Sequence, residues 1–293
     1  MSCADRYPDD VKVALATNMC YFLGINIEAI IKDVSWIKKT DNKLAFSDWY
    51  ADYTCFHMGR LQADSQLLSK YRDNLLKHYE DKDYIESIYY SSVGDYGSCT
   101  QFARPLDEAK RSLLEKVRAN EVVSWSESQH FDHHCKYIIS TIIANQSLLE
   151  ENVKKFSKEA SILIECYKIL QSLDFSFLAE IHQISVAQRY LAMLQQLFCN
   201  QHFDAVNLLD ESTYYFSEVS SVDGIIGNYT VYFFIYSHEY HRTKCEQAKR
   251  QSEFYFHKAE ELIKRNQHAR HHMHLTMFTD FFKQLNGDIN GEI

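Results

Sequence analysis

Residues that interrupt helices are scarce in this chain, which contains only two prolines and eight glycines among 293 residues. No proline follows Pro105. Inside a helix, proline costs about 3 kcal/mol and glycine about 1 kcal/mol relative to alanine. Long helices are therefore permitted over most of the sequence. We predict an all-α fold in which antiparallel helical hairpins form either a solenoid or a large helical bundle.

The same scarcity of glycine leaves little material for loops that bind phosphate or nucleotides. The chain has no G-x-x-x-x-G-K-[ST] loop, no G-x-G-x-x-G turn and no G-x-S-x-G nucleophile elbow. The zinc-protease motif H-E-x-x-H is also absent. These absences count against the common nucleotide-dependent and hydrolytic enzymes. We therefore expect a protein that is not an enzyme and that needs no cofactor.

Signals for secretion or membrane insertion are missing as well. The first ten residues lack the basic-then-apolar layout of a signal peptide, and no apolar run approaches the ~18 residues needed to span a membrane. Eight cysteines are scattered without any C-x-x-C spacing, which is typical of reduced thiols in an intracellular protein. We expect a cytoplasmic or nuclear location and no membrane partner.

The formal net charge of −9 argues against a general nucleic-acid binder, because affinity for the phosphate backbone rests on lysine and arginine. A local exception is the stretch 242–272, where eight basic residues outnumber four acidic ones. Such a stretch is usually a solvated helix face. It nevertheless leaves a nucleic-acid-associated factor open as one alternative function.

The residues that are plentiful fit a packed globular protein. Hydrophobic residues make up 46% and charged residues 24% of the chain, close to ordinary globular usage. The 20 tyrosines and 18 phenylalanines supply large rings that fill the space between helices. Tyrosine can also keep its hydroxyl in water at the rim of a groove, so a tyrosine-lined groove would suit the binding of a partner.

The clearest irregular segment is 92–104, where two glycines lie in a serine-rich stretch. Pro105 follows it at a position suited to the start of a helix. We predict an N-terminal helical part over 1–91, a loop over 92–104, a C-terminal helical array over 105–285 and a frayed tail over 286–293. The alternative is that both helical parts form one continuous domain.

Periodicity and capping residues predict the individual helices. Ser124 and Glu127 have the spacing of a capping box, and apolar residues then recur at helical spacing from Phe131 to Ile143. Further helices are predicted over 9–39, 106–119, 157–173, 174–200 and 203–219.

Two glycines predict an interruption in the C-terminal array. The stretch 220–224 has the composition of a turn, and Gly224 and Gly227 together mark a sharp change of direction. We expect Asn228 to open a helix that continues past Ile263.

One hairpin has an aromatic pattern between Val186 and Phe216. Its elements are Tyr190, Met193–Leu194, Leu197–Phe198 and the polar turn Asn200–Phe203. In this order and spacing the stretch resembles a tetratricopeptide-type helical hairpin. It departs from that motif at Leu194, where a small residue is expected, and at Ala205, which fits only after a one-residue deletion. The resemblance implies stacked helical hairpins and carries no function.

Histidine is the residue type whose distribution suggests metal chemistry, since the 14 histidines fall partly into local groups. Side chains at i, i+3 and i+4 of a helix converge on one point. The candidate metal ligands are Glu127, His130, His133, His134, His238 and His271. Zinc or iron would suit them, although a di-iron bundle site needs two Glu-x-x-His motifs and the chain offers one.

Because the signatures of common enzymes, membrane proteins and general nucleic-acid binders are missing, we favour a non-enzymatic helical scaffold or adaptor. Such a protein would hold a protein partner in a groove or on an apolar patch. The first alternative is a helical metalloenzyme or metal sensor that uses the clustered histidines. The second is the nucleic-acid-associated factor, which would act through the basic 242–272 stretch. Convergence of the histidines in space would favour the first alternative, and steep salt dependence of binding would favour the second.

Overall fold

The computed structural model describes residues 47–78, 82–144, 146–178, 182–266 and 268–285. These residues form thirteen α-helices and no strand, which confirms the all-α prediction. The helix predicted over 9–39 and the frayed tail predicted over 286–293 lie outside the described residues. Among the described helices, none is both long enough and apolar enough to cross a membrane.

The helices follow one another with short connections. In chain order they are α3 (Ser47–Gln62), α4 (Ser65–His78), α5 (Lys82–Ser92), α6 (Tyr96–Thr100), α7 (Leu106–Ala119), α8 (Trp125–Ala144), α9 (Leu149–Lys155), α10 (Ser157–Gln171), α11 (His182–Leu194), α12 (His202–Glu218), α13 (Val222–Thr243), α14 (Glu246–Asn266) and α15 (Ala269–Leu285). Short 3₁₀ turns lie at η2 (Gln146–Leu148) and η3 (Phe175–Phe177), and α11 runs into a π-turn, η4 (Gln195–Cys199).

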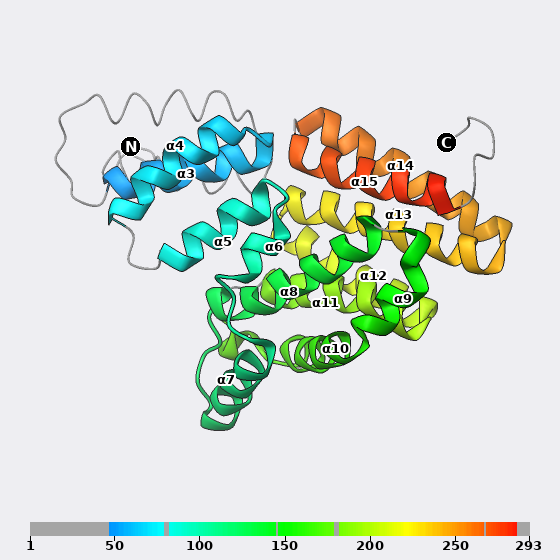
Figure 1. Ribbon diagram of the computed structural model, residues 1–293, viewed down its shortest axis with the longest axis horizontal. Coiled ribbons are helices and arrows are strands. Elements are labelled where there is room, and N and C mark those ends of the chain that lie inside the picture. The colour runs from blue at the N-terminus through cyan, green and yellow to red at the C-terminus, as the bar shows by residue number, and fades with distance from the viewer. Residues whose placement is uncertain (1–46, 79–81, 145, 179–181, 267, 286–293) are drawn as a thin grey trace, which may run out of the picture.

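Neighbouring helices in the chain pack against one another, as in α3 with α4, α11 with α12 and α13 with α14 (Figure 1). The helix α8 differs because it contacts α5, α6, α7, α10, α11 and α15. It therefore lies at the centre of the array. Helices that are distant in the sequence meet around it, since both α6 and α15 contact α8.

The α11–α12 pair is the hairpin that resembles the tetratricopeptide motif. Its two helices run antiparallel, since the Gln188 amide in the middle of α11 bonds to Glu211 in the middle of α12, and the His202 ring at the start of α12 bonds to Gln196 just after α11. Leu194 and Ala205, the two departures from the motif, are both fully buried. The structure thus shows adjacent packed helical pairs of the kind that helical repeats contain.

Two apolar cores hold the described residues together. The smaller lies within α3, α4 and α5, where Phe56, Leu61 and Leu75 are fully buried. The larger extends from α7 to α15. It includes the whole apolar stripe predicted from Phe131 to Ile143, whose large residues on one face of α8 are buried.

Local sequence signals at the start of α8 are confirmed. The Glu127 amide donates to the Ser124 hydroxyl at 3.3 Å, and the Ser124 amide donates to the Glu127 carboxylate at 2.8 Å. This reciprocal pair is the predicted capping box. The helix predicted over 106–119 is α7, with Pro105 directly before it.

The segment 92–104, predicted as a loop, contains the short helix α6. The reason is a capping interaction, since the Asp95 carboxylate accepts a hydrogen bond from the Ser98 amide at 3.0 Å. An aspartate at this position satisfies an amide that the first turn of a helix otherwise leaves unpaired. Because the segment has the amino-acid composition of a loop, the sequence does not indicate this short helix.

The turn predicted over 220–224 lies at 219–221, between α12 and α13. The change of direction predicted at Gly224 and Gly227 is wrong, because both glycines lie inside α13. A Cβ atom at Gly224 would overlap the ring of Phe216, and one at Gly227 would lie 2.7 Å from Nη1 of Arg189. The glycines therefore permit close packing between helices instead of reversing the chain.

The single helix predicted from Asn228 past Ile263 is likewise two helices, α13 and α14. The chain stops α13 at Lys244, which has a left-handed φ of 55°. A residue in this conformation ends a helix even where it is not glycine.

The last three described helices alternate in direction, so that α13 and α15 lie parallel (Figure 1). Side-chain contacts fix their register. Asp223 of α13 bonds to His271 of α15, and eleven residues later Phe234 packs its ring against Phe278 at 4.8 Å. The N-terminal ends of two helices that are distant in sequence are thereby brought together.

Candidate functional site

A cavity of about 80 Å³ lies among α6, α8, α11, α13 and α15. This is well above the roughly 10–15 Å³ that a cavity needs to hold one water molecule. Three cationic side chains line it, Lys136 from α8, Arg189 from α11 and Arg270 from α15. No carboxylate is among its lining residues within the described part of the chain.

Lys136 reaches the cavity from the middle of α8. Its Nζ donates to the hydroxyl of Ser91 at 3.1 Å, and this is a neutral partner. Burial lowers the pKa of Lys136, and the charge of Asp132 one turn earlier on the same helix opposes that effect. The lysine therefore carries its charge into a region where water is scarce.

Arg189 is held rigidly by neutral groups. Its Nε donates to Oδ1 of Asn228 at 2.6 Å, its Nη2 donates to the carbonyl of Gly224 at 2.6 Å, and its guanidinium lies 4.8 Å from the ring centre of Phe216. Burial lowers its pKa, but a guanidinium stays protonated in proteins. The absence of a side chain at Gly227 leaves room for Nη1.

Arg270 is the second residue of α15 and makes no hydrogen bond or ion pair with any other described residue. A cation in the first turn of a helix is opposed by the helix dipole, whose positive end lies there. The position therefore costs stability, which the attraction between Arg270 and the Asp223 carboxylate offsets in part. The hydrogen-bond donors of the Arg270 guanidinium are left for a group that enters the cavity.

Two carboxylates lie behind the cavity wall, Asp132, which is buried, and Asp223, which is partly buried. Burial raises the pKa of Asp132 to about 6, although Lys136 and a hydrogen bond from the Tyr167 hydroxyl at 2.9 Å act in the opposite direction. Burial would also raise the pKa of Asp223, but His271 and the charges of Arg270 and Arg60 outweigh it. These contacts hold the pKa of Asp223 well below its ordinary value, so this carboxylate is ionised.

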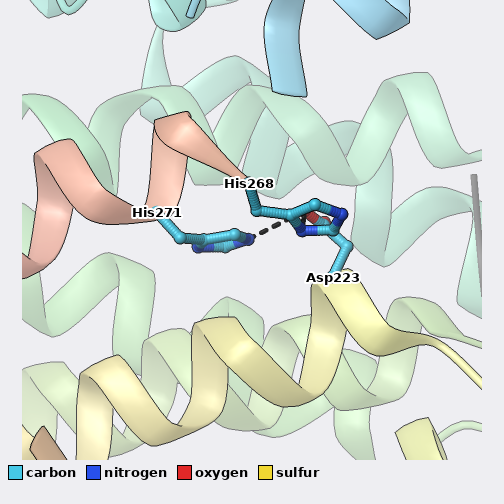
Figure 2. A group of neighbouring side chains, drawn as sticks. All are labelled: Asp223, His268 and His271. Carbon is cyan, nitrogen blue, oxygen red and sulfur yellow. Dashed lines mark hydrogen bonds and ion pairs between the residues drawn. The ribbon is translucent and has the colours of Figure 1, made fainter. Parts of the chain in front are cut away.

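Asp223 meets two histidines at the edge of the cavity (Figure 2). Its Oδ1 lies 2.8 Å from Nε2 of His271 and 3.8 Å from Nδ1 of His268. Burial lowers the pKa of both imidazoles. Since His271 also lines the cavity, it links this cluster to the cationic side chains. One ligand atom from each of the three residues lies within 4.8 Å of the others, which is the spacing of a possible metal site.

The other histidines considered from the sequence lie elsewhere, and His130, His134 and His238 have other partners. His130 accepts from the Arg104 amide, His134 bonds to the Arg104 carbonyl, and His238 contacts the Gln196 amide at 2.9 Å. Burial lowers the pKa of His133 well below its ordinary value.

Glu127 is also engaged away from the cluster, in the capping box and in an ion pair with Lys116 at 3.1 Å. Of the six residues predicted as ligands, the structure therefore places only His271 in a group of three potential ligands among the described residues.

Comparison of the chain with protein-family models, with curated proteins and with solved structures finds no match. The function of the site therefore has to be argued from its geometry.

Sequence reasoning missed the cationic lining and two members of the cluster, Asp223 and His268. Arg270 was counted in the basic 242–272 stretch, where most basic residues are solvated. One signal in the sequence does set Arg270 apart, namely its place in the first turn of a helix, where the dipole disfavours a cation. Asp223 and His268 are 45 residues apart in the numbering, and only the parallel register of α13 and α15 unites them.

Proposed function

We propose that the protein is a non-enzymatic helical adaptor whose partner presents a dianionic group, a phosphate ester, to the cavity. The observation that carries the proposal is the wall itself, with three cationic side chains and no carboxylate among its described residues. Asp132 and Asp223 lie behind the wall and offset this charge only in part, since two carboxylates face three cations. A positive charge kept from water without full compensation is costly, so a site for an anion gives the protein a reason to retain it.

The donors around the cavity suit phosphate. Arg189 presents a fixed, planar guanidinium, and such a fork matches the oxygens of phosphate. Lys136 and Arg270 add two further charges, and the hydroxyls of Tyr96 and Ser140 also line the space. The volume of about 80 Å³ accommodates a group of the size of phosphate.

The surrounding fold supports an adaptor role. Stacked helical hairpins offer extended surfaces on which a protein partner can lie, and the α11–α12 pair contributes Arg189 to the cavity. A tetratricopeptide-like array with a phosphate pocket would combine a broad protein contact with recognition of one modified side chain. The phosphate could equally be carried by a small molecule, and the two sources differ in how much of the surrounding surface they need.

The basic 242–272 stretch gives less support to a nucleic-acid role. Arg242 pairs with Glu239 at 2.8 Å, and Lys264 pairs with Glu260 at 3.0 Å. Arg270 points into the cavity instead of joining a surface stripe. The charge of the stretch is therefore partly compensated, whereas phosphate-backbone binding requires it to be available.

Calorimetric titration with inorganic phosphate, phosphoserine and succinate tests the proposal. The variant Arg270→Gln removes one cavity charge and breaks no internal hydrogen bond, and Arg265→Gln removes a charge from the exposed face of α14 as the matched control. We expect Arg270→Gln to weaken phosphate binding by about tenfold or more, since a hydrogen bond to a charged group contributes roughly 1.5–3 kcal/mol. Arg265→Gln should bind like the parent.

Two results would overturn the proposal. One is the absence of phosphate binding, or equal loss in both variants, which would mean that the overall charge acts and the cavity does not. The other is tighter binding of succinate than of phosphate. If phosphoserine binds no better than inorganic phosphate, the partner contributes little beyond the anion, and a small-molecule source is favoured.

A further inference from the structure

The cluster of Asp223, His268 and His271 has a feature that hydrogen bonding within the fold does not explain. His268 is 0% exposed, yet neither nitrogen of its ring has a hydrogen-bond partner. His271 is 2% exposed, and its Nδ1 is also unpaired. A buried polar atom left without a partner costs about 1–3 kcal/mol. An imidazole binds a metal ion through one nitrogen, so the fully unpaired ring of His268 is the observation that points to a ligand.

The geometry suits a single cation. His268 and His271 are three residues apart at the start of α15, so their rings lie on the same side of the helix. Asp223 approaches from the first turn of α13 and faces both rings (Figure 2). One nitrogen from each imidazole and one carboxylate oxygen lie within 4.8 Å of one another. Small side-chain movements would bring them to the separations that ligands of a common ion require.

We propose that Asp223, His268 and His271 form a mononuclear site for a divalent first-row transition metal, with zinc as the expected ion. Two imidazoles and one carboxylate are among the ligand sets that zinc uses in proteins. Three protein ligands leave a fourth position for water or another small ligand. Because His271 also lines the cationic cavity, the site adjoins the space assigned above to an anion.

Charge sets the expected strength of the site. Asp223 supplies one negative charge, while Arg270 and Arg60 are close enough to influence its ionisation. Two nearby cations oppose the binding of a third. We therefore expect weaker metal binding than at four-ligand structural zinc sites, and we expect phosphate in the cavity to strengthen it. The metal site itself does not depend on the proposed adaptor function.

Titration of the metal-stripped full chain with Co²⁺, followed by displacement with Zn²⁺, tests the proposal. We expect one equivalent of cobalt, with visible d–d absorption that zinc removes. His268→Asn is the decisive variant, because the native imidazole makes no hydrogen bond whose loss could unfold the protein. His272→Asn, which changes an exposed histidine on the same helix, is its matched control. Circular dichroism would verify that both variants are folded.

The proposal predicts that His268→Asn weakens cobalt binding at least tenfold and that His272→Asn leaves it unchanged. No stoichiometric binding in the parent protein would overturn it. Equal binding by both variants, or thiolate-to-cobalt charge-transfer bands that persist in His268→Asn, would place the ion elsewhere and overturn it as well. Failure of this test leaves the phosphate titrations of Arg270→Gln unaffected, so the two proposals fail separately.

Discussion

The helices α13 and α15 lie side by side, but their two ends have opposite chemistry. At the aromatic end, Phe233 and Phe234 of α13 pack with the rings of Phe278, Phe281 and Phe282 of α15, all of them buried. At the polar end the same two helices present Asp223 and Gly227 opposite Arg270 and His271. Over about three helical turns, this helix pair thus contributes both to the apolar core and to the polar site.

The difference shows how a small polar site can persist within an apolar core. Ring packing at the aromatic end gains free energy from buried apolar area. The polar end loses free energy, because it keeps cations and unpaired nitrogens away from water. The rigid register set by the rings holds the polar groups in place, so stability at one end permits function at the other.

The largest effect is expected at the aromatic end. Replacing Phe234, which is 0% exposed, with alanine should lower the free energy of unfolding by about 3–5 kcal/mol, because it removes a ring and leaves a cavity. Urea denaturation measures this. Phe203→Ala is the control, since Phe203 is 75% exposed and its loss should change stability by less than about 0.5 kcal/mol. A similar loss of unfolding free energy in both variants would contradict the conclusion that the aromatic end provides the stability.

A smaller effect is expected where the polar end is most crowded. The variant Gly227→Ala places a Cβ atom 2.7 Å from Nη1 of Arg189, and the overlap should cost about 1–3 kcal/mol of stability. It should also weaken phosphate binding, because the guanidinium has to move. Gly97→Ala is the matched control, since its Cβ atom would meet only Asp95 at 3.7 Å. Unchanged stability and phosphate affinity in Gly227→Ala would show that the guanidinium position is not fixed.

The smallest effect is a dependence of anion binding on pH. Burial raises the pKa of Asp132 to about 6, so this carboxylate gains its charge as the pH rises from 5 to 7. The new negative charge offsets Lys136, and we expect sulfate affinity to fall by roughly fivefold, or about 1 kcal/mol. Sulfate is preferred as the probe because a phosphate ester itself titrates near pH 6.

The variant Asp132→Asn separates this effect from other titrations. Its amide can still accept the hydrogen bond of Tyr167, and its sulfate affinity should stay at the low-pH level throughout. Among the groups that face Asp132, Lys136 and Arg189 remain charged, and burial raises the pKa of Tyr167. Calorimetry at several pH values measures the dependence. A pH profile that survives in Asp132→Asn would assign it to another group.

Much of the fold was predictable because its signals are local. The capping box at Ser124, the helix after Pro105 and the buried stripe of α8 each depend on residues within a few turns. The helix limits were less predictable near Gly224 and Gly227. These two glycines are needed because Phe216 and Arg189 of other helices pack close to them. No local pattern in the sequence distinguishes a glycine needed for such packing from a glycine in a turn.

The candidate site was hardly predictable from the sequence. His271 was considered a ligand, but its partners were sought among histidines on other helices. Asp223 joins it through the parallel register of α13 and α15, which depends on the length of α14 and on ring packing. Lys136 and Arg189 look like ordinary helix-surface residues until the packing of α8 and α11 turns them inward.

The contact between Gly227 and Arg189 also limits how this chain can diverge. An arginine at position 189 disfavours a side chain at position 227, whereas a shorter residue at 189 would leave room for alanine at 227. The two positions therefore constrain each other, although 38 positions separate them in the sequence. We expect a substitution at 227 to be accepted more easily in a chain that has first lost the guanidinium at 189.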